Sequence, residues 1–67
     1  MRIVQEIQTD GGQTALLPAL TFTDERAAES AYHQKLSAAA VSAVDVHTVI
    51  MYDEHGNIIR SEYYEHA

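Results

Sequence analysis

The chain has 67 residues, no cysteine, and ten acidic against four basic side chains, which gives a net charge of −6. This length allows one domain, residues 1–67, and the lack of cysteine excludes disulfides and thiolate metal sites. A hydrophobic share of 46% excludes a disordered composition, and no apolar run reaches the roughly 20 residues of a membrane span.

The charge balance limits the partners that we expect. Nucleic-acid affinity comes largely from Lys and Arg side chains that replace counterions, and the four basic residues form no run in this sequence. We therefore predict no direct binding to nucleic acid and no binding to a membrane. The first ten residues lack the apolar block of a signal peptide, so the expected location is cytoplasmic.

Strand patterns open the chain. Residues 2–9 are rich in β-branched side chains that alternate with polar ones, which predicts a strand. The sequence DGG at residues 10–12 predicts a tight turn, because glycine accepts positive φ. Residues 13–21 suit a second strand paired through this turn, but Pro18 cannot donate a ladder hydrogen bond. Such a strand is therefore an edge strand or is broken at Pro18.

A helix is predicted over residues 24–40, where almost every residue favours helix. Thr23 is the predicted N-cap, because its hydroxyl precedes two acids in the first turn. Apolar residues recur at three- and four-residue steps and form the stripe Ala28, Ala31, Tyr32, Leu36, Ala39 and Ala40. This stripe is mostly alanine and buries little area, so a partner subunit is expected to add stability.

Two further strands are predicted after the helix. Residues 44–52 alternate, and Val49 and Met51 make the second face apolar too, which is typical of a central strand covered on both sides. Residues 53–57 read as a polar turn, and residues 58–65 as the closing strand. The acids and the histidine of the sequence YDEHGNIIR therefore belong to a hairpin tip that faces water.

These elements predict a two-layer α+β domain with one helix packed on one face of an antiparallel sheet of three to four strands. The order is strand, an optional second strand, helix, strand and strand. The sequence offers no second helix to cover the other sheet face, which favours a homo-oligomer.

Neither a metal site nor a catalytic site is predicted. Zinc needs three or four converging ligands, whereas His33 has only Glu29 one helical turn away. His47 has only Asp45 on its strand face. The serines lack the glycine-flanked turn of a hydrolase nucleophile, and no phosphate-binding loop is present. We therefore expect no enzyme activity, no cofactor and no metal.

Adjacent tyrosines suggest an interface. Tyr63 and Tyr64 must point to opposite faces of the closing strand, so one of them lies on the face away from the helix. An exposed tyrosine with apolar neighbours forms the kind of patch that is enriched at interfaces. The predicted interface residues are Val49, Met51, Ile58, Tyr63 and Tyr64. The alternative is that these residues only cover a small core.

The stretch AESAYHQKLSAAAVSAVDVHTVIMYDEHGNIIRSEYYEH, with EIQTDGG before it, resembles a group of very short uncharacterised proteins of gut bacteria that often lie near phage-like or mobile elements. The resemblance covers most of the chain and implies an accessory role in a mobile element, but no activity, cofactor or site residue. In size, charge and fold class the chain is also similar to anti-CRISPR proteins, an analogy that no motif supports.

Three functions follow from these observations. The first is a non-catalytic protein-interaction module that self-associates through its uncovered sheet face or an open edge. The alternative is an acidic, anti-CRISPR-like phage inhibitor that presents Asp24, Glu25 and Glu29 to a basic groove of a host protein. The third is a minor enzyme or metal binder.

Overall fold

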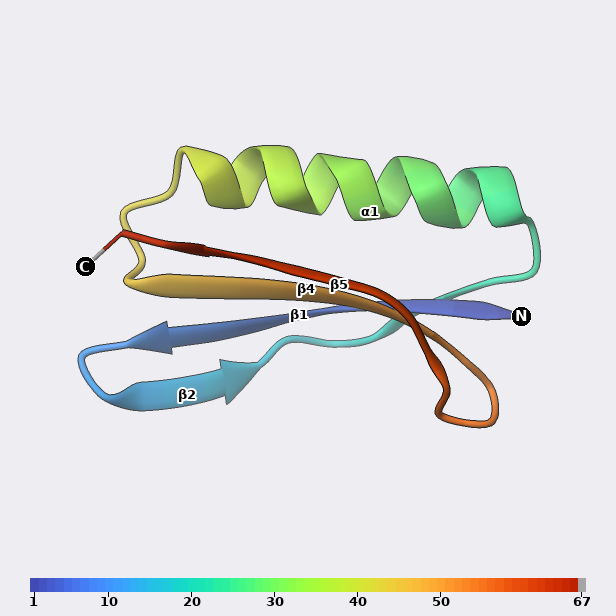
Figure 1. Cartoon of the computed structure of the whole chain (residues 1–67), viewed down its shortest axis with the longest axis horizontal. Helices are drawn as coiled ribbons and strands as arrows, with labels where there is room; N and C mark the ends of the chain where they lie inside the picture. Colours follow the sequence, from blue (N-terminus) through green and yellow to red (C-terminus); the bar gives the residue numbers. More distant parts are fainter. Residues whose placement is uncertain (67) are drawn as a thin grey trace.

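The computed structural model describes residues 1–66 and has two layers, with one helix lying across one face of an antiparallel sheet (Figure 1). The elements in chain order are β1 (Arg2–Asp10), β2 (Gln13–Leu16), β3 (Leu20–Phe22), α1 (Glu25–Ala40), β4 (Val46–Asp53) and β5 (Ile58–Glu65). The predicted two-layer α+β fold is confirmed, and the sheet has five strands instead of the expected three to four.

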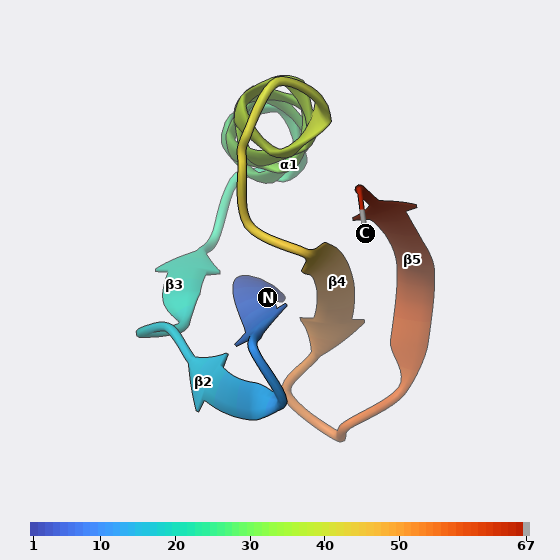
Figure 2. The same ribbon diagram turned by 90° about the vertical axis from the view of Figure 1, so that its left-hand side faces the viewer.

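The strands β1 and β4 form the middle of the sheet. The strand order is β2-β1-β4-β5, β3 also pairs with β1, and every pair is antiparallel. In Figure 2 the strands are seen nearly end-on, with β5 outermost on one side, β2 and β3 on the other, and α1 above. β5 and the β2–β3 segment are therefore the two edges of the sheet.

The edge formed by β2 and β3 is one strand interrupted at Pro18. β2 pairs with the second half of β1, and β3 pairs with its first three residues. The amide N–H of Leu17 still donates to the carbonyl of Glu6 at 3.0 Å, so the ladder stops directly before the proline. Pro18 has no N–H to continue the ladder. The prediction of a strand broken at this residue is confirmed, and the break accounts for the additional strand.

Both predicted turns are present. Gly11 and Gly12 have φ values of 58° and 80°, and they alone connect β1 to β2. Positive φ at both positions is what a two-residue hairpin turn of type I′ requires. In the second hairpin, the Asp53 carboxylate accepts the amide N–H groups of His55 and Asn57 at 2.9 Å each. The acids and the histidine of this loop therefore lie in a turn, as predicted.

The helix begins one residue later than expected. Asp24, and not Thr23, is the N-cap, because its carboxylate accepts the amide N–H of Arg26 at 3.0 Å. Both residue types can cap a helix, and the acid also interacts favourably with the positive helix end. Within residues 1–66, no helix has the length and apolar character needed to cross a membrane.

The core lies between α1 and the middle of the sheet. It consists of Val4, Ala28, Tyr32, Leu36, Val49 and Met51, with Phe22 packed against it. Of the predicted helix stripe, Ala28, Tyr32, Leu36 and Ala39 are buried, while Ala40 is exposed.

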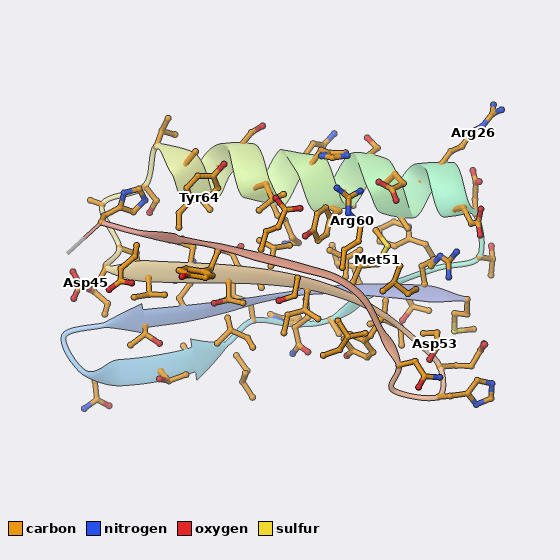
Figure 3. All side chains as sticks on the ribbon, viewed as in Figure 1. Arg26, Asp45, Met51, Asp53, Arg60 and Tyr64 are labelled. Atoms are coloured by element: carbon orange, nitrogen blue, oxygen red, sulfur yellow. The ribbon has the colours of Figure 1, made fainter. Side chains whose placement is uncertain are left out.

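Two of the predicted interface residues belong to this core. Val49 is 0% exposed and Met51 is 1% exposed. Figure 3 shows Met51 between the sheet and α1. The prediction that these two residues line an interface on the far face is therefore wrong, because α1 covers the face to which they point.

Candidate interaction surface and polar clusters

The sheet face opposite α1, which we call the open face, carries a continuous set of apolar side chains. Cross-strand partners share a face, so the register defines its members. The apolar members are Ile3, Ile7, Leu16, Val46, Ile50, Tyr52, Ile58 and Tyr63. The polar members are Gln5, Thr9, Thr14, Thr21, Thr48, Ser61 and Glu65.

Charge is almost absent from the open face. Glu65 is its one charged member among the described strands, although the chain has ten acidic and four basic residues. The polar groups at its centre bond to each other, since the hydroxyl of Tyr52 donates to Gln5 Oε1 at 3.2 Å. Gln5 Nε2 in turn donates to the carbonyl of Leu17 at 3.0 Å. The centre of the face is therefore neutral and largely satisfied in its hydrogen bonding.

The most exposed apolar side chains of the open face lie towards its two edges. Leu16 on β2 is 69% exposed, and Ile58 and Tyr63 on β5 are each 66% exposed. The predicted interface residues Ile58 and Tyr63 thus lie on the open face. Tyr64 points to the α1 side of β5 and stacks on His66, with ring centroids 6.4 Å apart (Figure 3).

The open face is large enough for a small specific interface. The molecule extends 34 Å along its longest axis, which follows the strands, and 16 Å along its shortest, which crosses them (Figure 1, Figure 2). These whole-molecule extents limit one face to about 540 Å² and two faces in contact to about 1,100 Å², which is at the low end of specific interfaces.

A second feature, which the sequence analysis missed, is a cluster of the buried residues Glu6 and His47 with the half-buried Ser42. Glu6 is 8% exposed and His47 is 4% exposed. His47 Nδ1 lies 2.5 Å from Glu6 Oε2, and His47 Nε2 lies 2.8 Å from Ser42 Oγ. The cluster joins β1, β4 and the loop that leaves α1.

Further contacts stabilise the Glu6 carboxylate. Gln8 Nε2 donates to Glu6 Oε2 at 3.1 Å, and Lys35 Nζ lies 3.9 Å from Oε1. Burial alone would raise the pKa of the Glu6 carboxyl, but the hydrogen bonds from Gln8 and His47 and the charges of His47 and Lys35 outweigh it. The pKa of Glu6 is therefore lower than its usual value.

The order serine, histidine, carboxylate is that of a hydrolase triad. Whether the cluster could act as one depends on the surroundings of Ser42. Ser42 follows the C-terminal end of α1, where the carbonyls of Ala38 and Ala39 accept the N–H groups of Val41 and Ser42. A helix C-terminus carries partial negative charge, which disfavours an oxyanion. An oxyanion hole needs free, converging N–H donors, and the N–H of Val44 already donates to Ser42 Oγ at 3.2 Å.

A groove beside the cluster reaches Glu6 but not the Ser42 hydroxyl. It lies between α1 and β3 and is lined by Glu6, Leu20, Ala31, Gln34, Lys35 and Ala38. Neither His47 nor Ser42 lines it. The contacts of the cluster fasten the loop after α1 to the sheet, and the N–H groups of Val41, Ser42 and Val44 are already engaged.

A polar cluster at the other end of the core ties α1 to β5. The Tyr32 hydroxyl donates to Glu62 Oε1 at 3.0 Å, and the Arg60 guanidinium lies 4.9 Å from the centre of the Tyr32 ring. Arg60 Nη1 also donates to Glu29 Oε2 at 2.8 Å. Burial, followed by the hydrogen bond to Glu62 and its charge, raises the pKa of Tyr32 to about 12.

The other predicted side-chain pairs are placed as follows. His33 Nε2 lies 3.4 Å from Glu29 Oε2, as the helical spacing suggested. Asp45 does not join His47; its carboxylate accepts the N–H of Gly11 at 3.2 Å instead. In the described part of the chain, no group of three or more His, Cys, Asp or Glu side chains is placed to hold a metal ion.

The fold and its surfaces define a small two-layer α+β domain with one apolar, nearly uncharged sheet face. Comparison of the chain with protein-family models, curated proteins and solved structures finds no match.

Proposed function

We propose that this chain is a non-catalytic interaction module that associates with further copies of itself through the open face. The observation that carries the proposal is the distribution of charge. The open face holds apolar and uncharged polar side chains and a single charged residue, Glu65, while the remaining charged residues lie on the α1 side, on α1 or in the turns. Tyrosine and apolar residues without central charges are typical of interface cores.

A second copy fits this surface better than a charged partner does. The net charge of −6 opposes association of identical chains. This repulsion is weakest when the open faces meet, because nearly all the charged side chains then lie away from the contact and are screened by salt. An isologous contact also needs only a self-complementary surface, and small apolar and hydroxyl side chains supply one. Within residues 1–66 the one helix covers one face of the sheet, and a copy would cover the second.

The alternative, an acidic inhibitor of a basic groove, has less support from the contacts. Asp24 caps α1, Glu25 pairs with Arg2, and Glu29 pairs with Arg60 and His33. These acids are already engaged within the molecule. A basic partner would have to compete with those contacts for each of them.

The test of the open face is a charge placed at its centre. Thr48 lies between Ile7 and Tyr63 on the central strand β4. A lysine at this position remains solvated in a single copy but is buried without a partner in a face-to-face contact. We expect Thr48→Lys to weaken association at least about 100-fold, because burying an unpaired charge at an interface costs several kcal/mol.

Sedimentation equilibrium over a dilution series measures this effect. The wild-type mass should exceed 7.4 kDa at high concentration, and Thr48→Lys should lower the average mass at the same concentration. Ser37→Lys is the matched control, because it adds the same charge on the exposed side of α1. A wild-type mass of 7.4 kDa at every concentration, or equal masses for both lysine variants, would contradict the proposal.

The non-catalytic part of the proposal is tested at Ser42. Because the nearby N–H groups of Val41, Ser42 and Val44 are already engaged, we expect no covalent adduct of Ser42 with a fluorophosphonate probe. Intact mass spectrometry reads the result, with a serine hydrolase labelled under the same conditions as the positive control. An adduct on Ser42 that disappears in His47→Ala would show an activated nucleophile and overturn this part.

A further inference from the structure

The strand β5 is a long, regular and unpaired edge. Within residues 1–66 its eight residues pair with β4 alone, and Figure 2 shows it as the outermost strand on its side. Its single irregularity lies at its start, opposite Met51 and Tyr52. The other edge is divided at Pro18 into strands of four and three residues. Exposed edges that lack proline or bulges are ready to pair with another strand.

The direction of the backbone groups on β5 follows from one hydrogen bond. The N–H of His66 donates to the carbonyl of Asp45 at 2.7 Å, and this pair continues the β4–β5 register. Hydrogen-bonded and non-hydrogen-bonded pairs alternate along an antiparallel ladder. The backbone groups of Arg60, Glu62 and Tyr64 therefore point to β4. Those of Ser61, Tyr63 and Glu65 point outward from the sheet.

From this geometry we propose that β5 pairs antiparallel with β5 of a second copy, in the register that places Ser61 opposite Ser61. The proposal rests on self-association as the function and adds a second surface to the open face. In this register the outward N–H of each Ser61 donates to the carbonyl of the other Ser61. The two-fold axis is perpendicular to the sheet, so both helices lie on the same side.

Charge selects this register over its neighbours. In the register centred on Ser61, Arg60 of each copy lies opposite Glu62 of the other. This register therefore has two pairs of opposite charge. A shift by one step in one direction places Glu62 opposite Glu62, and a shift in the other places Arg60 opposite Arg60. Opposite charges across strands stabilise a pair, and like charges destabilise it.

Both side chains would make these contacts in addition to those within the molecule, where Glu62 accepts from Tyr32 and Arg60 donates to Glu29. Arg60 Nη2 lies 3.5 Å from Glu62 Oε1 of its own strand, so both project side by side on the α1 side of β5. The guanidinium has five N–H donors and can bind Glu29 and a second carboxylate together. A strand of another sequence would need this same alternation of charge, and β5 itself supplies it.

Two different two-fold contacts close into a tetramer when their axes intersect at right angles. The open-face axis lies in the plane of the sheet, and the β5 axis is perpendicular to it. Their combination predicts a mass of about 30 kDa, four times 7.4 kDa. Loss of either contact alone leaves a dimer.

Amide hydrogen exchange measured by NMR tests the edge on the unmodified protein. The amides of Ser61 and Tyr63 should exchange at least about tenfold more slowly at high than at low protein concentration. The Glu65 amide should stay fast, because its opposite position lies beyond the start of the second β5. Glu62 and Tyr64 are internal references, since their amides point to β4 at any concentration.

The substitution Ser61→Pro gives a second, independent test of the β5 edge contact. It removes the outward N–H without breaking a bond to β4, and Ser61→Ala is the matched control that keeps the N–H. We expect the proline variant to fall from the tetramer to the open-face dimer, and the alanine variant to keep the wild-type mass. Circular dichroism verifies that both remain folded, and the exchange measurement needs no variant.

The outcomes separate the two proposals. Fast exchange at Ser61 and Tyr63, in a protein that still associates and responds to Thr48→Lys, would overturn the edge contact and leave the open face standing. Slow exchange at both amides, with no response to Thr48→Lys, would support the edge and overturn the open face. A mass of 7.4 kDa at all concentrations would overturn both.

Discussion

Replacement of Tyr32 by alanine should lower the free energy of unfolding at 25 °C by about 3–5 kcal/mol. The Tyr32 side chain is 0% exposed and is the largest in a core otherwise built from alanine, valine, leucine and methionine. Truncation of a buried aromatic ring to alanine costs about 3–5 kcal/mol. A domain of this length has a total stability of about 3–10 kcal/mol, so one substitution removes much of it.

Tyr32→Phe separates the ring from the hydroxyl. It keeps the core filled and removes only the donor to Glu62, whose carboxylate remains near Arg60. We expect a cost of about 1–2 kcal/mol. Urea unfolding followed by circular dichroism measures both variants, at one low protein concentration because association adds to apparent stability. If the phenylalanine variant lost as much stability as the alanine variant, the polar contact and not the packing of the ring would dominate.

Replacement of Glu6 by glutamine should lower the free energy of unfolding at pH 7 by about 2–4 kcal/mol. The substitution leaves His47 without its carboxylate and Lys35 without its nearest charge in a region that is largely closed to water. Breaking one partner of a buried charged pair is costly because the other partner stays buried. Glu25→Gln is the matched control, since Glu25 is exposed and its pair with Arg2 contributes little.

The pH dependence follows from the direction of the Glu6 pKa. A carboxyl whose pKa is lower in the folded than in the unfolded protein stabilises the fold above its unfolded pKa, and that stability is lost as pH falls through the folded pKa. Wild-type protein should therefore lose more stability than Glu6→Gln between about pH 5 and about pH 3. Urea unfolding at several pH values tests this, and parallel curves would show that Glu6 does not titrate with folding.

The layers, the helix and both turns could be predicted from sequence because each has a local cause. A glycine pair, polar turn residues and a run of helix-forming residues each act over a short stretch of the chain. Which strand face the helix covers could not be predicted, because Ile50 and Tyr52 on one face of β4 are as apolar as Val49 and Met51 on the other. Alternation divides a strand into two faces but does not identify the buried one when both are apolar.

The Glu6–His47 contact also lay beyond the sequence analysis. The two residues are 41 positions apart and meet only once β1 and β4 pair in register. The available signal was an ionisable side chain within each of two strands, Glu6 in the middle of β1 and His47 near the start of β4. Such a residue is costly to bury alone, so two of them indicate a pair.

The break at Pro18 sets a limit on how far such a protein can polymerise. A sheet with two intact edges can pair with a further strand at each edge and grow into a fibre. Here the β2–β3 edge offers strands of only four and three residues on either side of a proline, whereas β5 is uninterrupted from Arg60 onward. Pairing through β5 would occupy the one uninterrupted sheet edge of each molecule. We therefore expect a closed assembly rather than an amyloid-like filament, even at high concentration.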